Sequence, residues 1–447
     1  MVELRFTRLK NLLIFCLAAS ALFLAGQLWF DRIANRSLTY AVSALLPFGG
    51  TIVPAQTGHV LRPFRVVFNQ GEGVFIILHG PTGYAAPVAL LEEALLHGEF
   101  VRADALDWAF ILENSVALVD YAFPVPTDFF LGVFNQTQRV INLSSRMQTF
   151  NAIAILPVAS DTASHVIFID EAGSRMVTYV VPAILAPDAV PLSSNSDITY
   201  ISSVLADLPM FEGSHFVPVW QRGYYPLLNA VNPYAHEGSL MLDPIGRMVS
   251  FLFDNPERVY SARSNDGVFI YSNESTVVRY HPNGVLEYTN YSPPADRTVG
   301  TMATDFLTTL AFIGRGQNIT MDYHLAAVRA IPDGHVFYFD YTTPVFPILW
   351  PETFVAEVGM PSPIIVTVEH NRVSRYQKFV YNFKAEALYA WRLDESFLEA
   401  YGARLGLGEA AVTLDALLLG YKMESSRSLD LSWFMGINGA FMVASTQ

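Results

Sequence analysis

The chain has 447 residues, of which 52% are hydrophobic and 13% aromatic, and its formal net charge is −14 at pH 7. This acidic balance repels a phosphate backbone, so we expect no nucleic-acid partner. The only cysteine is Cys16, which excludes an internal disulfide framework, so core packing must stabilise the fold. The length is enough for about two to four domains.

The first structural signal along the chain is an uncharged apolar run at residues 12–30. At about 1.5 Å per helical residue, this run is long enough to cross the hydrocarbon core of a bilayer. Arg5, Arg8 and Lys10 precede it, and the positive-inside rule therefore places the N-terminus in the cytoplasm. We expect residues 1–36 to form a cytoplasmic tail and a single-pass transmembrane anchor, with the bulk of the chain outside the cell membrane.

Signal-peptide processing is the alternative to a retained anchor. Leu24, Ala25 and Gly26 would complete a lipoprotein cleavage site only if a cysteine followed, and the next residue is Gln27. Residues 19–21 offer a small-x-small cleavage site, but it would leave only a short apolar stretch before it, whereas the whole run exceeds the usual secretory length of about 7–15 residues. The retained anchor is the favoured interpretation, and cleavage at this site stays open.

The anchor helix has two contrasting stripes when successive residues are placed about 100° apart. One stripe holds Cys16, Ser20 and Gln27, and the opposite one holds Ala18, Ala21 and Ala25. A glutamine amide in lipid needs a hydrogen-bond partner, and small residues four positions apart let two helices approach closely. These six residues are our candidate contacts with partner transmembrane helices. The alternative is that Gln27 lies among the headgroups and the alanines only fill space.

A first exterior domain is expected at residues 37–197. A proline- and serine-rich stretch at 182–197 has the composition of a linker and sets its end. Before the linker, the pattern predicts strands at 65–69 and 74–80, an amphipathic helix at 87–100, paired strands at 109–123, and a hairpin at 164–181 that turns at 171–173.

Two segments of the remaining chain resemble each other, at residues 277–291 and 366–381. In each, a strand enters a tight turn at an asparagine and leaves through the pattern V-x-x-Y. The alignment pairs Asn283 with Asn371, Val285 with Val373, and Tyr288 with Tyr376. The dipeptide Asn283-Gly284 is typical of a type I′ hairpin turn, because both residues tolerate a positive φ.

This repeat predicts two α+β units of one topology. The central domain is expected at 198–300 and the C-terminal domain at 301–447, the latter opening with a helix at 304–316. The predicted fold class is therefore α+β, with a single N-terminal transmembrane helix followed by a three-domain, β-rich exterior whose last two domains share a topology.

Known catalytic and metal-binding signatures are absent from the sequence. Residues 76–83 place a His-Gly pair after a strand, as in the oxyanion loop of some hydrolases. No G-x-S-x-G nucleophile elbow accompanies it, so a strand ending in a turn is the favoured interpretation. H-E-x-x-H and Walker signatures do not occur either. We expect no cofactor, no metal site and no catalytic residue, while a zinc site assembled from distant residues stays open.

With these features the chain resembles the YycH family, the membrane-anchored regulators that accompany the essential cell-wall sensor kinase of low-GC Gram-positive bacteria. The resemblance lies at residues 9–30, where a basic start and an apolar span close on Q-L-W-F, and at 277–291 and 421–443. The shorter sister family, YycI, shares the style of the anchor, but this chain is too long for it. The low lysine content and the long linker at 182–197 depart from the family pattern.

The resemblance implies a non-enzymatic protein whose second and third exterior domains share a topology. It also implies association with a YycI-like membrane protein and, through transmembrane helices, with a sensor histidine kinase whose activity it tunes. The alternative from a different functional class is an extracytoplasmic envelope-binding or hydrolytic enzyme, with a site assembled from distant residues.

N-terminal sequencing of the membrane-bound protein tests the retained anchor. We expect the mature chain to begin at or near Met1, because the apolar run is long enough to span a bilayer and lipoprotein processing has no cysteine to modify. A mature N-terminus that follows Ala21 or Gly26 would show cleavage instead.

Overall fold

The structure, a computed structural model, describes most of the chain from residue 61 onward. The described residues are 61–79, 84–134, 142–158, 163–185, 199–206, 215–218, 222–236, 239–294, 297–315, 322–343, 346–392, 416–424, 428–437 and 440–445. All of them belong to one unit, Gly58–Gln447. Within these ranges no helix is long and apolar enough to cross a membrane, and the predicted anchor at 12–30 lies outside them.

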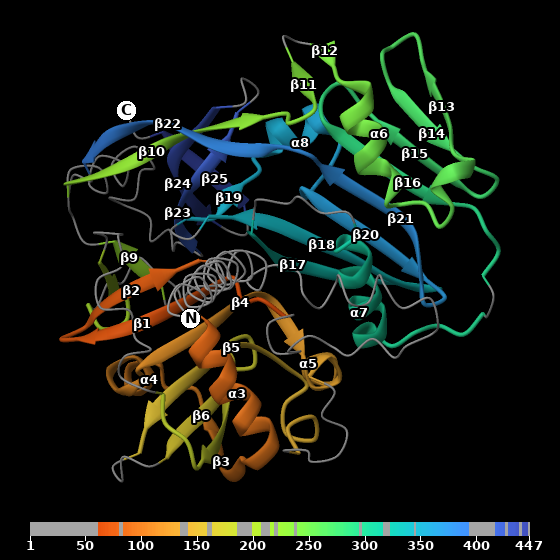
Figure 1. Ribbon diagram of the computed structural model, residues 1–447. Coiled ribbons are helices and arrows are strands. Elements are labelled where there is room, and N and C mark those ends of the chain that lie inside the picture. The colour runs from red at the N-terminus through yellow and green to blue at the C-terminus, as the bar shows by residue number, and fades with distance from the viewer. Residues whose placement is uncertain are drawn as a thin grey trace, which may run out of the picture. The chain divides into compact units, whose positions relative to one another are not determined.

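Nine of the described strands form an antiparallel N-terminal sheet in the order β3-β7-β6-β5-β4-β1-β2-β8-β9 (Figure 1). Their bounds are β1 Arg65–Gly71, β2 Val74–Leu78, β3 Glu99–Ala105, β4 Ala117–Pro126, β5 Thr149–Pro157, β6 Ser164–Asp170, β7 Arg175–Val181, β8 Tyr200–Ser202 and β9 Phe216–Pro218. Strands β5 and β6 are buried along most of their length, as expected for strands covered on both faces. The predicted strands at 65–69 and 74–80 and the hairpin at 164–181 are confirmed.

Three helices accompany this sheet: α3 (Ala85–His97), α4 (Trp108–Asn114) and α5 (Thr127–Val133). The predicted helix at 87–100 is confirmed as α3. It ends earlier than predicted because Gly98 leaves the helical conformation while its N–H still donates to the Ala94 carbonyl at 2.8 Å. The chain then enters strand β3 directly.

The predicted pair of strands at 109–123 is wrong in its first half, which is helix α4. Asp107 precedes this helix, and its side chain accepts a hydrogen bond from the Phe110 N–H at 3.0 Å. Such a cap satisfies one of the free donors at a helix start. The helix also buries Ile111 and Leu112, so capping and burial together override the strand-like composition. Of the two strands predicted at 109–123, only the second is present, as part of β4.

The two predicted repeat segments lie in one further antiparallel sheet, whose eight described strands follow the order β13-β14-β15-β16-β21-β20-β18-β17. Their bounds are β13 Tyr260–Arg263, β14 Phe269–Ser272, β15 Thr276–Tyr280, β16 Val285–Asn290, β17 Asp322–Ile331, β18 Gly334–Thr342, β20 Ile364–Glu369 and β21 Arg372–Phe379. Each half is a four-stranded meander, green for one and teal to blue for the other in Figure 1. Helix α6 (Leu242–Ser250) precedes the first meander and α7 (Met302–Ile313) the second. The paired strands follow one another in the same order in both halves, but the second half carries β19 (Ile348–Leu349) and helix α8 (Glu352–Val358) between β18 and β20.

The last strands of the two meanders pair with each other and place a local two-fold axis in the sheet. Tyr288 of β16 lies directly opposite Tyr376 of β21. These are the residues that the sequence alignment treats as equivalent, so each tyrosine faces its own counterpart across the axis. Both are buried, and the Phe312 ring of α7 packs on them at centroid distances of 4.8 and 5.4 Å. The repeats therefore share one sheet, while the domain edges at 198–300 and 301–447 stay predictions.

The two repeat hairpins turn differently, and the predicted type I′ turn at Asn283-Gly284 is wrong. Gly284 has a φ of 87°, but Asn283 is not among the residues with positive φ. Pro282 fixes its own φ near −65°, which favours a type I turn followed by a left-handed glycine. The two-residue turn with positive φ at both positions is instead His370-Asn371, at 51° and 57°.

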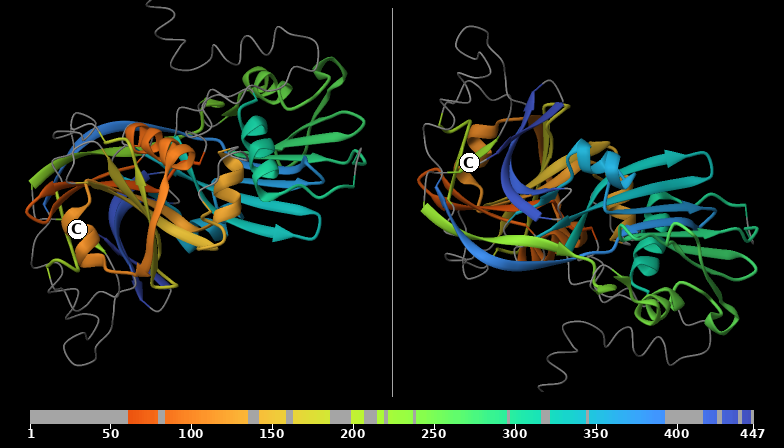
Figure 2. Two further views of the ribbon diagram at one scale, coloured as in Figure 1. Left: turned by 90° about the horizontal axis from the view of Figure 1, so that it is seen from below. Right: turned by 90° about the horizontal axis from the view of Figure 1, so that it is seen from above.

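A third sheet is built from strands far apart in the chain, in the order β19-β23-β24-β10-β22, with β25 also paired to β24. Their bounds are β10 Arg222–Val231, β19 Ile348–Leu349, β22 Asn382–Arg392, β23 Ala416–Met423, β24 Ser428–Ile437 and β25 Ala440–Ser445. Strands β10 and β22 form a long ribbon that is visible in both views of Figure 2.

The remaining elements are β11 Ala235–His236, β12 Ser239–Leu240, α8 Glu352–Val358 and the short 3-10 helix Pro256–Arg258. The described chain is thus a β-rich α+β fold, as predicted.

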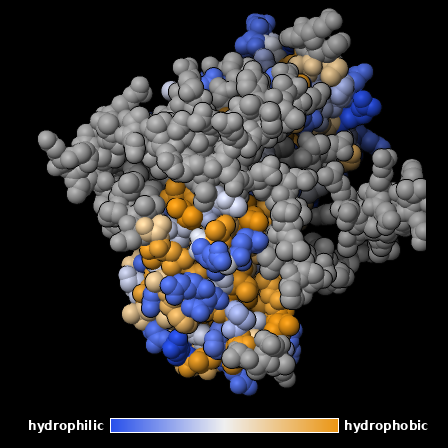
Figure 3. All heavy atoms as spheres, turned by 90° about the vertical axis from the view of Figure 1, so that its left-hand side faces the viewer, coloured by the Kyte–Doolittle hydropathy of each residue, from blue (hydrophilic) through white to orange (hydrophobic). Residues whose placement is uncertain are grey.

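The surface of the N-terminal sheet and its helices is mixed in character. In the lower half of Figure 3, hydrophobic and hydrophilic side chains alternate over the described surface. Edge strand β3 is exposed along its whole length, and its Arg102 and Asp104 form an ion pair of 2.8 Å. Charges on an exposed edge oppose pairing with another strand.

Helices α5 and α7 connect the N-terminal sheet to the repeat sheet. The Phe129 and Phe306 rings meet edge to face, with centroids 5.3 Å apart. Gly132 lies against Ala303, and a Cβ added to Gly132 would come within 2.7 Å of the Ala303 Cβ. The close approach of the two helices therefore depends on the missing side chain of Gly132.

Substitution Gly132→Ala should destabilise the fold by about 1–3 kcal/mol, because the added methyl overpacks the contact between α5 and α7. The matched control is Gly246→Ala in α6, where the added Cβ would meet only the Tyr271 ring at an ordinary 3.8 Å. This control should be neutral or stabilise by up to about 1 kcal/mol through helix propensity. Urea unfolding of both variants is the measurement, and equal effects would contradict the packing argument.

Candidate functional site

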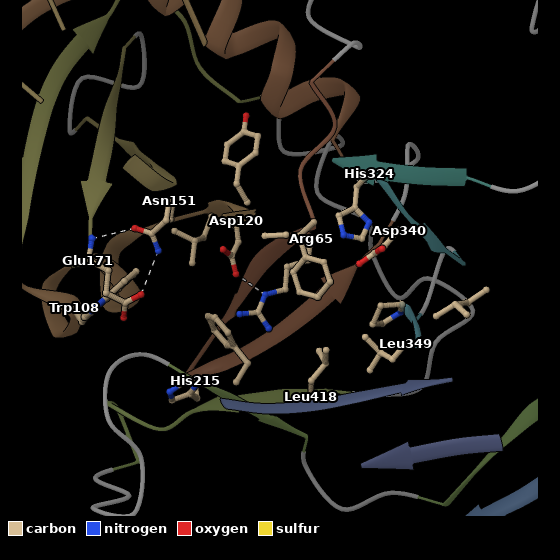
Figure 4. A pocket seen from close by; sticks show the side chains of 18 residues that line it. Arg65, Trp108, Asp120, Asn151, Glu171, His215, His324, Asp340, Leu349 and Leu418 are labelled. Atoms are coloured by element: carbon tan, nitrogen blue, oxygen red, sulfur yellow. Dashed lines mark hydrogen bonds and ion pairs between the residues drawn. The ribbon is translucent and has the colours of Figure 1, made fainter. Parts of the chain in front are cut away.

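A cavity of about 420 Å³ lies where the three sheets meet. Strands β1 and β4 line one side, β17 and β18 a second, and β19 and β23 a third (Figure 4). Small-ligand pockets usually have volumes of about 300–1,000 Å³, so this cavity has the size of a binding site. Most of its lining residues lie on strands, which the ladder hydrogen bonds hold in place.

An ion pair between Arg65 and Asp120 lies in the middle of the cavity (Figure 4). The two residues are direct neighbours on β1 and β4, and the Arg65 Nε donates to Asp120 Oδ2 at 2.7 Å. The guanidinium also lies 5.4 Å from the centre of the Phe216 ring. Their side chains are only 14% and 17% exposed, so loss of one partner would leave an uncompensated charge largely out of water.

A second ion pair links the segment before β1 to the start of β17. The Arg62 Nη1 donates to Asp322 Oδ1 at 3.3 Å, and the guanidinium lies 5.3 Å from the Tyr323 ring centre. About a third of each charged side chain is exposed (31% and 35%), so water screens the pair. Its main effect is to orient the two segments that border the cavity.

Two buried histidines flank Phe64 beside the cavity. The His79 ring meets Phe64 at 5.1 Å and the His324 ring meets it at 5.2 Å, and each histidine is only 4% exposed. The His79 Nδ1 lies 3.1 Å from the Phe64 carbonyl, so this nitrogen must carry the proton and donate. Burial, aided by the charge of Arg65, lowers the pKa of His79 to about 3, and burial lowers that of His324 to about 4. Both rings are neutral at pH 7.

Asp340 provides a carboxylate at the same end of the cavity as His324 (Figure 4). The two residues are direct partners in the β17–β18 ladder, so their side chains leave the same face of the sheet. Burial raises the pKa of Asp340 to about 6, and a hydrogen bond from the Ser362 side chain partly opposes this shift. Asp340 is therefore mostly ionised at pH 7 and exchanges its proton near neutrality.

The other end of the cavity holds Asn151, Glu171 and Trp108 (Figure 4). The Asn151 Nδ2 donates to Glu171 Oε2 at 3.2 Å, and the Glu171 N–H donates to Asn151 Oδ1 at 3.0 Å. This reciprocal pair fixes the position of the carboxylate. The Trp108 Nε1 is buried and has no hydrogen-bond partner within the described part of the chain.

The titratable groups of the lining are mainly carboxylates. Among the described residues that line the cavity, serine, threonine, cysteine and lysine are absent, while Asp120, Glu171 and Asp340 carry carboxylates, a group that can act as a nucleophile or as an acid–base catalyst. No group of three or more histidine, cysteine or acidic side chains that could hold a metal ion occurs in the described ranges. His79, which the sequence places before a glycine, lies at the end of β2 and serves packing.

None of the predicted site residues can be placed. Cys16, Ala18, Ser20, Ala21, Ala25 and Gln27 all lie outside the described residues. The cavity residues were not predicted, because they come from positions as distant as Phe64 and Leu418. One local signal points to two of them: Asp120 and Asp340 each stand before a tyrosine inside a largely apolar strand, where a charge needs a special environment.

No protein-family model matches the chain, and no curated protein matches it by sequence. The crystal structure of YycH from Bacillus subtilis matches it with a TM-score of 0.53, over 87% of this chain and 97% of that chain. The fold is YycH-like. The sequence identity is 10%, so the likeness to YycH concerns the fold and carries no residue roles.

Acid should destabilise the protein through His79 and His324. Their native pKa values of about 3 and 4 lie below the ordinary 6.5, so each histidine stabilises the fold above pH 6.5 and loses this contribution as the pH falls. Asp340 acts in the opposite direction because its pKa is raised. Its contribution to the stability of the fold is present at low pH and is lost as the pH rises from 3.8 to about 6. From pH 7 to pH 5 we expect His324 alone to account for about 2 kcal/mol of lost unfolding free energy.

Urea unfolding at pH 7 and pH 5 measures this effect. In the variant His324→Gln the difference between the two pH values should shrink by about 2 kcal/mol. The control is Leu96→Gln in α3, a residue that is 38% exposed and carries no titratable group, so the difference should stay unchanged. An unchanged pH dependence in His324→Gln would contradict a buried neutral histidine.

Proposed function

We propose that this protein is a non-enzymatic, membrane-anchored regulator that associates with a cell-wall sensor histidine kinase and a YycI-like protein and tunes kinase activity. The observation that carries the proposal is the YycH-like fold, which extends over 97% of the YycH chain. A match of this extent covers the N-terminal sheet and the repeats together, so it supports a role that uses the whole exterior. The predicted anchor at 12–30 supplies the membrane attachment that such a regulator requires.

The cavity chemistry is compatible with this role. Arg65 and Asp120 neutralise each other, and Glu171 is held by Asn151. These charged groups are used within the fold, which supports a structural or ligand-binding function over a hydrolytic one.

The anchor stripes suggest how coupling to the kinase is achieved. Gln27 and Ser20 on one side offer hydrogen bonds to a partner helix, and Ala21 and Ala25 on the other allow close packing. Interhelical hydrogen bonds in membranes contribute about 0.6–2 kcal/mol each. A difference of this size between two kinase states shifts their populations several-fold.

Expression of the kinase's target genes tests this coupling in cells that carry anchor variants at matched protein levels. Gln27→Leu, or Ala21→Ile combined with Ala25→Ile, should change target-gene expression several-fold, because each alters one stripe. Leu17→Ile and Leu24→Ile keep the apolar volume and should have little effect. Co-purification of the kinase and the YycI-like protein with the wild-type chain reports the association directly.

A scrambled apolar helix that regulates as well as the native anchor would contradict coupling through the stripes. Failure of the wild-type chain to co-purify with either partner would contradict the regulatory proposal itself. The two measurements therefore separate the site of coupling from the existence of the partnership.

The alternative is an extracytoplasmic enzyme that acts on an envelope component. It is favoured by one observation, the cavity-facing Asp340, whose pKa of about 6 suits a general acid at neutral pH. Hydrolysis of purified envelope material by the wild-type protein, abolished by Asp340→Asn, would support this alternative. Equally low hydrolysis by the wild type and by Asp340→Asn would contradict the enzymatic alternative.

A further inference from the structure

The cavity carries more negative than positive charge. Arg65 is the one arginine or lysine among its described lining residues, and Asp120 neutralises it at 2.7 Å. Two further carboxylates, Asp340 and Glu171, lie at opposite ends (Figure 4). His324, which lies at the Asp340 end, is neutral, and the second lining histidine, His215, lies away from Asp340 (Figure 4), so no basic group of the described lining balances the charge at this end. The electrostatic environment therefore attracts cations and repels anions.

The Asp340 end is the better site for a cation. Its hydrogen-bond partner among the described residues is the Ser362 side chain, and within that part of the chain no ion pair joins Asp340 to a basic group. Beside it, the His324 Nδ1 is buried without a described partner. A half-buried carboxylate without an ion-pair partner and an unsatisfied ring nitrogen are both costly, and a donor that reaches this corner would relieve the cost.

Several of the remaining lining residues are aliphatic. Leu118 of β4, Ile348 and Leu349 of β19 and Leu418 of β23 line the cavity, and Figure 4 places Leu349 toward the same end of the cavity as Asp340. These side chains offer contact to hydrocarbon but no ligands to a hydrated metal ion. A ligand that uses both features has a charged donor at one end and an apolar body.

We propose that this cavity binds a small organic cation, with a primary ammonium group held by Asp340 and an apolar body packed against Leu349 and Leu418. An ammonium group has three donors, which matches a carboxylate and a neutral histidine placed side by side. Arg65 does not oppose the ligand, because Asp120 already compensates its charge. This ligand proposal does not rest on the regulatory role, since the observations behind it all concern described residues of the cavity lining.

Calorimetric titration of the full-length protein with three probes of nearly equal size tests the charge requirement. The probes are 2-phenylethylamine, 2-phenylethanol and phenylacetate, which are a cation, a neutral molecule and an anion at pH 7.5. We expect saturable one-to-one binding of the amine, at least tenfold weaker binding of the alcohol, and no binding of phenylacetate. Equal affinities for the amine and the alcohol, or no binding of the amine at 10 mM, would overturn the proposal.

Two variants locate the site. Asp340→Asn should weaken amine binding at least tenfold, and Leu349→Trp should abolish it by filling the cavity. The control Asp243→Asn, an exposed carboxylate on α6, should bind the amine as the wild type does. Unchanged affinity in both cavity variants would overturn the proposal. If either variant fails to fold, the selectivity of the wild-type protein among the three probes still tests the proposal. Anchor variants that lose kinase regulation should bind the amine normally, so the two proposals fail independently.

Discussion

The antiparallel pairing of β16 with β21 is the constraint on which the rest of the described fold depends. This pairing joins two meanders into one sheet and fixes their registers through Tyr288 and Tyr376. Once the central register is set, β17 and β18 lie at one end of the sheet, where His324 and Asp340 face the strands of the N-terminal sheet. The cavity is therefore a product of the way the repeats join.

The junction around the cavity combines neutralised charge with aromatic packing. Phe64 lies between two neutral histidines, and its neighbour Arg65 is paired with Asp120. Buried polar groups of this kind contribute specificity of arrangement, because each has few geometries in which its partner is reached. At this junction Asp340 differs from Arg65, since no described basic group compensates it.

Local patterns in the sequence predict the elements that short-range physics determines. The helix at 87–100, the hairpin at 164–181 and the repeat alignment through Tyr288 and Tyr376 all rest on periodicity or turn chemistry, and the structure contains them. The segment at 109–123 could not be read in this way, because the Asp107 cap and the burial of its apolar side decide its conformation. The cavity could not be predicted from the sequence at all, because no pattern within one segment reveals that β1, β18 and β23 converge.

The tyrosine pair on the local two-fold axis also constrains how such a sheet can arise. At this axis each repeat presents the same edge to the other, which is the geometry of an isologous interface between identical subunits. One half taken alone would present its last strand as an open edge that a second copy could pair with in this register. Joining the two halves in one chain turns that contact into an internal ladder, so neither β16 nor β21 remains an edge strand.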